Sequence, residues 1–180
     1  MFRVLLFLVA AAFAAAAPTS FRDSDGATHQ PLGKAPEHKA TVLLFLMPDC
    51  PVANAMAPEL SRIASEYGKR GVRFYAVYAT SDAAEVAAHR RDYRLPFPGL
   101  LDPKCVLARG AGATRVPEAA VYSAEQKLLY RGRIDDRAVK VGRIRPEPGR
   151  HDLRAALDAI LAGRKPDPAT TEAVGCYLPL

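Results

Sequence analysis

The chain has 180 residues, of which 25 are Lys or Arg and 19 are Asp or Glu, and 49% of the residues are apolar. This length fits one domain with short appendages, and the apolar content excludes a disordered chain. Three cysteines are too few for a small disulfide framework, and the scattered Gly and Pro residues form no repeat. The net charge of +6 comes from cations interleaved with acids, and the chain has no Trp, so we expect no nucleic-acid interface.

Residues 1–16 have the pattern of a secretory signal peptide. Arg3 precedes an apolar run from Val4 to Ala16, which ends in small residues around an Ala14-x-Ala16 cleavage site. A membrane anchor would need about 20 apolar residues, so we expect membrane contact only through an uncleaved signal. Export to the periplasm or cell envelope would place the three cysteines in an oxidising compartment.

The first half of the mature chain predicts alternating strands and helices after a lead-in segment, residues 17–39, that is rich in Pro, Asp, Ser, Gly and His. The continuous apolar run Thr41–Met47 is typical of a strand buried on both faces. Helical spacing of apolar residues follows up to Tyr67, and Gly68 ends that helix. Next come a second strand, Val72–Ala79, and a helix that is capped by Ser81 or Asp82 and runs to about Tyr93.

The second half predicts a hairpin between two further helices. We expect an edge strand at Pro98–Leu101 and a helix that starts at Asp102-Pro103 and runs through Arg109. The hairpin Ala119–Ser123 and Leu128–Gly132 leads into a polar loop, 133–150, and a last helix, His151–Ala162. The domain therefore spans residues 40–163, before a tail, 164–180, that carries Cys176. This order predicts an α/β fold with a central mixed sheet and helices on both faces.

Cys50-Pro51 lies where the first buried strand meets the first helix. A thiol at the start of a helix faces unpaired backbone N–H groups and the positive end of the helix dipole, and both favour the thiolate. The neighbouring Asp49 opposes this effect. We predict that Cys50 is a nucleophile; the alternative is a buried, inert cysteine.

Two sequence stretches resemble the thioredoxin-like superfamily. Leu44–Asn54, with Pro58-Glu59-Leu60 after it, is most similar to the active-site stretch of redoxins of the alkyl hydroperoxide reductase/thiol-specific antioxidant (AhpC/TSA) group. The second stretch is Val116-Pro117-Glu118 ahead of the hairpin, and the helix and Gly-Cys tail after it resemble exported bacterial redoxin-domain proteins. The resemblance implies a thioredoxin-like fold, a cis Pro117 that faces Cys50, and partners that dock as extended chains beside Val116 and Pro117.

Departures from the family pattern bear on the mechanism. Thioredoxins carry Cys-x-x-Cys, but the second position here is Ala53; peroxiredoxins carry a Pro and a Thr where this chain has Leu43 and Met47. The peroxiredoxin Arg would fall at Val116, and Arg115 is one position away. We therefore favour thiol–disulfide exchange through Cys50, with protein thiols or disulfides as partners. The alternatives are a one-Cys antioxidant peroxidase that uses a hydroperoxide, with Cys50 passing through sulfenic acid, and a redox-inactive binding module.

The other cysteines and the histidines receive separate predictions. We expect the tail to be mobile, so that Cys176 can swing to Cys50 as a resolving or regulatory thiol; a structural staple or a free thiol are the alternatives. Cys105 is expected to be a small buried residue. Four isolated histidines show no ligand spacing, and Asn54 stands where copper carriers of this superfamily have a second Cys, so we expect no metal and no cofactor. The four histidines are His29, His38, His89 and His151.

Overall fold

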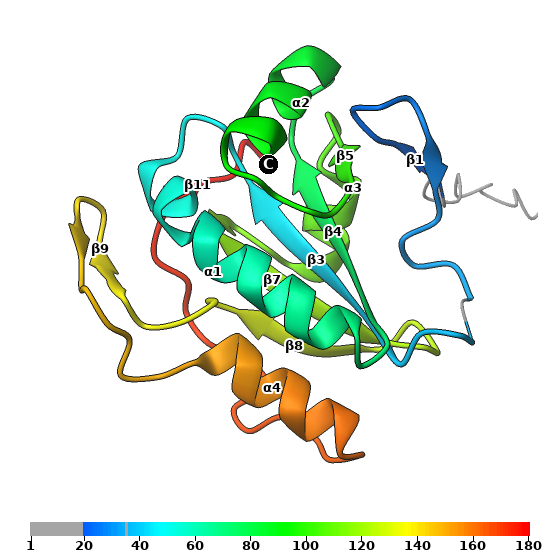
Figure 1. The fold of residues 1–180 in the computed structure, drawn as a ribbon, viewed down its shortest axis with the longest axis vertical. Helices are drawn as coiled ribbons and strands as arrows, with labels where there is room; N and C mark the ends of the chain where they lie inside the picture. Colours follow the sequence, from blue (N-terminus) through cyan, green and yellow to red (C-terminus); the bar gives the residue numbers. More distant parts are fainter. Residues whose placement is uncertain (1–19, 35) are drawn as a thin grey trace, which may run out of the picture.

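The computed structural model describes residues 20–34 and 36–180. Its centre is a five-stranded sheet in the order β5-β4-β3-β7-β8 (Figure 1). Three strands of this sheet are parallel to one another: β3 (Ala40–Leu46), β4 (Val72–Tyr78) and β5 (Gly99–Leu101). The antiparallel hairpin of β7 (Glu118–Ser123) and β8 (Leu128–Gly132) joins the sheet along β3. The predicted mixed sheet is confirmed.

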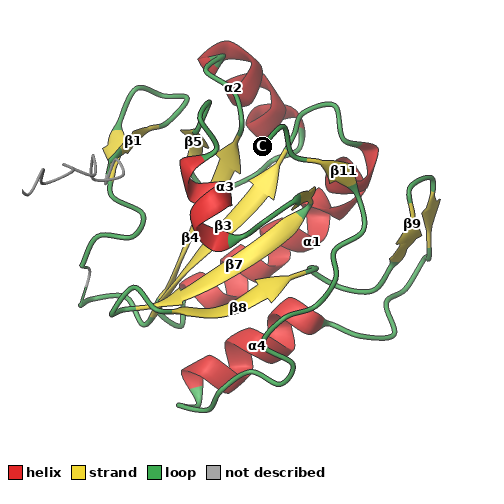
Figure 2. Ribbon diagram, turned by 180° about the vertical axis from the view of Figure 1, so that it is seen from behind, coloured by secondary structure: helices red, strands yellow, loops and turns green. Residues whose placement is uncertain are grey.

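Helices cover both faces of this sheet. Within the described residues the helices are α1 (Pro51–Gly68), α2 (Ala83–Asp92), α3 (Val106–Ala111) and α4 (Asp152–Leu161). In Figure 1, α1 and α4 lie over the face turned to the viewer, and Figure 2 shows α3 in front of the opposite face. All seven residues of β3 are buried, as expected for a continuously apolar strand between two helical layers. This central strand leads directly to Cys50.

The lead-in segment is more ordered than its composition predicts. Residues 21–29 form a small hairpin of β1 (Phe21–Arg22) and β2 (Thr28–His29). The buried Asp23 carboxylate accepts hydrogen bonds from the backbone N–H groups of Asp25 and Ala27, at 2.9 and 2.8 Å. Phe21 packs into the core. The Phe21 side chain, the local carboxylate turn and a hydrogen bond from the Ser24 N–H to the Gly99 carbonyl together hold this segment, and none of them creates a periodic sequence signal.

The predicted start of the third helix at Asp102-Pro103 is wrong. α3 begins at Val106, and Cys105 precedes it in a left-handed conformation with φ 51°. Asp102 still satisfies the helix start, because its carboxylate accepts hydrogen bonds from the backbone N–H groups of Val106 and Leu107, at 2.7 and 2.9 Å. The Asp-Pro signal thus marks a capping turn ahead of the helix.

Both segments expected to be irregular contain strands. The loop 133–150 holds a short hairpin of β9 (Ala138–Lys140) and β10 (Arg143–Ile144). The tail contains β11 (Cys176–Tyr177), which pairs with β6 (Arg115–Val116). The tail is therefore docked on the domain, which contradicts the expectation of a mobile segment.

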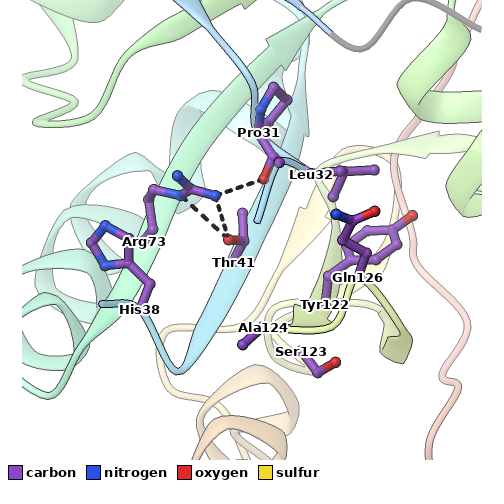
Figure 3. A pocket seen from close by; sticks show the side chains of 10 residues that line it. Pro31, Leu32, His38, Thr41, Arg73, Tyr122, Ser123, Ala124 and Gln126 are labelled. Atoms are coloured by element: carbon purple, nitrogen blue, oxygen red, sulfur yellow. Dashed lines mark hydrogen bonds between the residues drawn. The ribbon is translucent and has the colours of Figure 1, made fainter. Parts of the chain in front are cut away.

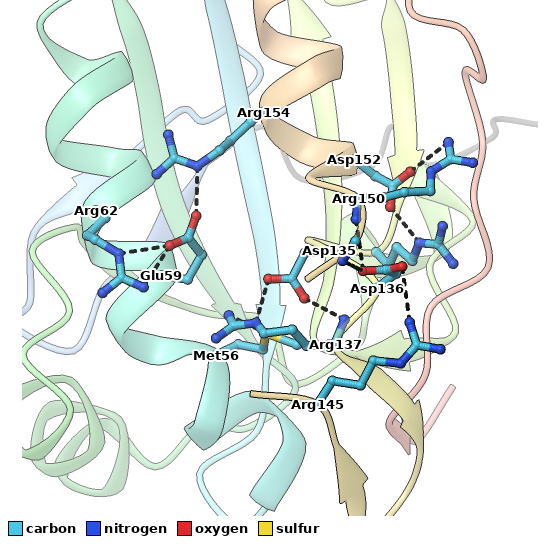
Figure 4. A network of polar contacts seen from close by, with 12 residues as sticks. Met56, Glu59, Arg62, Asp135, Asp136, Arg137, Arg145, Arg150, Asp152 and Arg154 are labelled. Carbon is cyan, nitrogen blue, oxygen red and sulfur yellow. Dashed lines mark hydrogen bonds and ion pairs between the residues drawn. The ribbon is translucent and has the colours of Figure 1, made fainter. Parts of the chain in front are cut away.

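A polar network anchors the loop 133–150 and α4 to the site helix α1 (Figure 4). Glu59 on α1 accepts hydrogen bonds from Arg62 and Arg154, at 2.8 and 2.7 Å. Asp135 accepts from Arg137 at 2.9 Å, whereas its neighbour Asp136 accepts from the backbone of the loop. The adjacent aspartates thus have separate structural partners.

Among residues 20–34 and 36–180, none of the helices has the length and apolarity that a membrane span requires. The predicted signal peptide, residues 1–16, lies outside the described residues.

Candidate active site at Cys50

Cys50 occupies the N-cap position of α1, and Pro51 is the first residue of that helix. The chain leaves β3 through a turn in which the Cys50 N–H donates to the Met47 carbonyl at 3.2 Å. Pro is favoured at the first helical position because its missing N–H would be unpaired there anyway. The Cys50 side chain is fully buried, so the candidate nucleophile is covered in this structure.

The Val116–Pro117 peptide bond is cis and faces this cysteine. The Cys50 thiol donates a hydrogen bond to the Val116 carbonyl, with 3.4 Å between Sγ and O. The structure therefore brings together the four residues that the sequence places at the site, Cys50, Pro51, Val116 and Pro117. This hydrogen bond holds the Cys50 side chain against the segment that carries the cis-proline.

Glu118 holds the bend that contains Pro117. Its carboxylate is buried and accepts hydrogen bonds from the backbone N–H groups of Thr114 and Arg115, at 2.9 and 3.1 Å. The Arg131 guanidinium donates to the same carboxylate at 3.1 Å and balances its charge. A buried carboxylate with several charge-assisted partners fixes backbone geometry. The Glu of the Val-Pro-Glu stretch therefore positions the cis peptide.

A second buried network supports the Cys50 turn from the other side. The Asn54 amide donates to the Pro48 carbonyl at 2.9 Å, and its oxygen pairs with His89 Nε2 at 2.8 Å. The other ring nitrogen of His89 lies 2.8 Å from the Tyr78 hydroxyl. Burial lowers the pKa of His89, which favours a neutral ring that donates through Nε2 and accepts through Nδ1. Sequence reasoning missed this network, because its members lie on three separate elements.

Cys176 lies directly against the site. In the antiparallel pairing of β11 with β6, Cys176 is opposite Val116, the residue whose carbonyl accepts the Cys50 thiol. Burial, contact with the Cys50 sulfur and the negative charge of Asp49 raise the pKa of the Cys176 thiol to about 11. Cys176 is half-buried, and all three cysteines are free thiols in this structure.

Cys105 is buried, as expected from the sequence, and contacts the tail. Its thiol lies 3.6 Å from the Pro179 carbonyl and donates to it. Burial and the nearby Asp102 raise the pKa of Cys105, which disfavours the reactive thiolate.

The Arg115 side chain is engaged by the tail. Its guanidinium lies 3.6 Å above the Tyr177 ring and donates to the Gly175 carbonyl at 3.3 Å. Leu43 is buried in β3 and Met47 is partly buried behind the Cys50 turn. Neither side chain offers the hydrogen bonds that would stabilise the breaking O–O bond.

Two hollows differ in their relation to Cys50. A hollow of about 170 Å³ adjoins the Cys50 turn and is lined by residues that include Met47, Pro48, Asp49 and Pro179. The cavity in Figure 3 lies near Thr41 and Arg73, at the opposite end of β3, and its volume of about 10 Å³ holds one water molecule at most. In the part of the chain that the structure describes, no three His, Cys, Asp or Glu side chains gather as metal ligands would.

A cysteine at the start of α1 that faces a cis-proline beside a mixed sheet defines a thioredoxin-like protein. A solution structure of a putative thioredoxin from Neisseria meningitidis has this fold, with a TM-score of 0.60 and 21% identity over 79% of this chain and 87% of that chain. The family model of the AhpC/TSA family matches residues 7–131. The chain therefore belongs to the AhpC/TSA family. No relative was found among curated proteins.

Two further solved structures are similar to this chain at 26% identity. An uncharacterized conserved protein from Geobacillus kaustophilus matches with a TM-score of 0.73, over 89% of this chain and 88% of that chain. A secreted disulfide oxidoreductase from Mycobacterium tuberculosis, described as homologous to E. coli DsbE, matches with a TM-score of 0.51, over 61% of this chain and 78% of that chain. The family and the mycobacterial neighbour support a redox role.

Proposed function

We propose that this chain is an exported thiol–disulfide exchange protein, in which Cys50 is the nucleophile and Cys176 resolves the mixed disulfide. The observation that carries the proposal is the register of β11. It sets Cys176 opposite Val116, whose carbonyl accepts the Cys50 thiol. Cys50, from the start of the domain, and Cys176, from the tail, thus both lie beside the segment that carries the cis-proline.

The exchange proceeds in two balanced steps. The Cys50 thiolate attacks one sulfur of a partner disulfide, forms a mixed disulfide, and releases the other partner sulfur as a thiolate that takes a proton from solvent. The Cys176 thiol then loses its proton and attacks the Cys50 sulfur, which forms Cys50–Cys176 and releases the second partner thiolate. The partner gains two electrons and the protein dithiol loses two; the reverse sequence oxidises a partner dithiol.

Three observations support this function over peroxide reduction. The mycobacterial neighbour is described as a secreted disulfide oxidoreductase. Leu43 and Met47 are apolar, and the Arg115 guanidinium packs on Tyr177.

The leader-like sequence of residues 1–16 and the secreted neighbour support export.

Cysteine variants test the proposal with a peptide disulfide as substrate and an excess of an external thiol. We expect Cys50→Ser to lower the exchange rate at least about 100-fold, because no other thiol holds this position. Without the external thiol, Cys176→Ser completes the first step and accumulates the mixed disulfide, which mass spectrometry detects. Cys105→Ser is the matched control and keeps the parent rate.

Mass mapping of protein from the cell envelope completes the test. We expect a Cys50–Cys176 linked peptide and a mature N-terminus after Ala16. Rapid turnover of hydrogen peroxide without disulfide exchange would replace this function with a peroxidase. Inactivity toward both substrates would leave a binding module.

A further inference from the structure

Residues 169–178, here called the strap, cover the site along a defined path. The strap first joins the edge of β8: the Arg131 N–H donates to the Ala169 carbonyl and the Thr171 N–H donates to the Arg131 carbonyl, both at 3.0 Å. It then crosses to β6, where the Leu178 N–H donates to the Thr114 carbonyl at 3.0 Å. The strap therefore uses backbone hydrogen bonds at both of its ends.

Two glycines permit this close approach. A Cβ atom built on Gly132 would lie 2.1 Å from Thr171 Oγ1, and one built on Gly175 would lie 1.8 Å from the Val116 carbonyl oxygen. Neither position accepts a side chain without movement of the strap. Gly175 immediately precedes Cys176, so the absence of its side chain lets the backbone bring Cys176 down to Val116.

Side chains hold the far end of the strap in place. Leu178 is buried with only 7% of its surface exposed, and it belongs to the core cluster. Pro179 borders the hollow beside the Cys50 turn, and its carbonyl accepts the Cys105 thiol. Leu180, by contrast, is 48% exposed. One apolar side chain, Leu178, therefore anchors the strap beyond Cys176.

The strap pairs with the backbone edge of β6 on which an extended partner chain would dock. β6 offers its strand-pairing edge next to the cis-proline, and β11 takes this edge in antiparallel register. Cys50 itself has no exposed surface. Cys176 of the strap contacts the Cys50 sulfur, so movement of the strap uncovers this side of the sulfur.

We propose that the strap is a built-in gate, which holds the partner edge of β6 as a bound substrate would and must leave before Cys50 reacts with an outside group. That the gated thiol serves disulfide exchange rests on the proposed function. A partner displaces the strap, forms the mixed disulfide with Cys50, and is expelled when the strap docks again and returns Cys176 to the Cys50 sulfur. The same edge thus serves partner binding and product release in turn.

Alkylation of Cys50 tests the gate without any exchange reaction. The background is Cys105→Ser with Cys176→Ser, so that Cys50 is the only thiol, and mass spectrometry follows its reaction with iodoacetamide. Leu178→Asp and Gly175→Val each undock the strap by a different route. We expect each to raise the alkylation rate about ten-fold or more, because the lost burial of Leu178 shifts a docking equilibrium by that order and a side chain at position 175 would overlap the Val116 carbonyl oxygen.

Leu180→Asp is the matched control, since it makes the same chemical change at an exposed position and should leave the rate unchanged. Urea unfolding of each variant separates strap release from global unfolding, because a variant that only releases the strap loses no more than the docking free energy of the strap and stays folded in the absence of urea, where alkylation is followed. Equal alkylation rates in the background and in both strap variants would overturn the gate. The gate stands if alkylation is accelerated while disulfide exchange is absent, and in that case only the proposed function falls.

Discussion

At the scale of single residues, the two thiols of the site differ in their surroundings. Cys50 is enclosed at a helix start, whereas Cys176 is half-buried beside the Asp49 carboxylate. The pKa of Cys176 is raised to about 11, so this residue is a neutral thiol at physiological pH. Attack on a mixed disulfide requires the thiolate, so Cys176 must lose its proton before it resolves the bond to Cys50.

This difference predicts that the free energy of unfolding falls at alkaline pH because Cys176 ionises. A folded-state pKa above the ordinary value of 9.0 stabilises the fold while the thiol is protonated. The stabilisation is complete below that value and is lost as the pH rises through about 11. We expect the reduced Cys105→Ser protein to lose about 1 kcal/mol more of its free energy of unfolding across this window than Cys105→Ser/Cys176→Ser, a figure reduced because Cys176 is partly exposed.

Urea unfolding of both proteins over a pH series measures the loss, with excess reductant to keep the thiols free. The two proteins share every tyrosine, so tyrosine ionisation cancels in the difference. Parallel pH profiles would show that Cys176 does not contact the Cys50 sulfur in solution.

The sequence predicted those site residues that can be recognised from their immediate neighbours in the chain. Cys50-Pro51 is recognisable because a strand ends and a helix starts there, and Pro117 is recognisable from its family stretch. Asn54 and His89 lie 35 positions apart and acquire a role only when α2 packs beside α1. The need for a glycine at position 175 likewise becomes visible only in the fold, where the Val116 carbonyl lies against it. Contacts between distant segments create no local pattern.

At the scale of elements, His89 connects α2 to the turn that carries Cys50. It contacts Asn54 and Tyr78 together, and Asn54 holds the Pro48 carbonyl within that turn. We expect His89→Leu to lower the free energy of unfolding by about 2–3 kcal/mol, because it leaves the Tyr78 hydroxyl and the Asn54 oxygen buried without a partner. Urea unfolding at neutral pH measures this loss.

The same variant should also loosen the Cys50 turn and increase Cys50 alkylation in the single-thiol background. His151→Leu is the control, since His151 is exposed and makes no capping hydrogen bond. A stability equal to that of the control would show that the network does not support the site.

The elements themselves followed from periodicity where they are long. β3, β4, α1 and α4 have continuous or helical apolar patterns, and the structure confirms them. The start of α3 was misplaced because Asp102 caps across a left-handed Cys105. β11 was missed because it has two residues and depends on β6 for its pairing. Short strands of this kind are fixed by their partners and not by their own composition.

At the scale of the whole molecule, the strap links the two halves of the fold. β3 and α1 deliver Cys50 from the first half, while the segment after α4 passes β8 and β6 and returns to the same point (Figures 1 and 2). A bond between Cys50 and Cys176 would join positions 126 residues apart. Oxidation should therefore act on the stability of the entire domain and not only on the strap.

We expect the oxidised protein to have a free energy of unfolding about 2–4 kcal/mol higher than the reduced protein, because a cross-link over so long a loop restricts the unfolded chain. The docked position of β11 makes this gain attainable, since the strap already brings Cys176 to Cys50 before the bond forms. Urea unfolding with and without a thiol reductant measures the difference, and Cys176→Ser should show none. If oxidation instead left stability unchanged or lowered it, the strap would have to leave its docked position to form the bond, and Cys176 would not be poised for resolution.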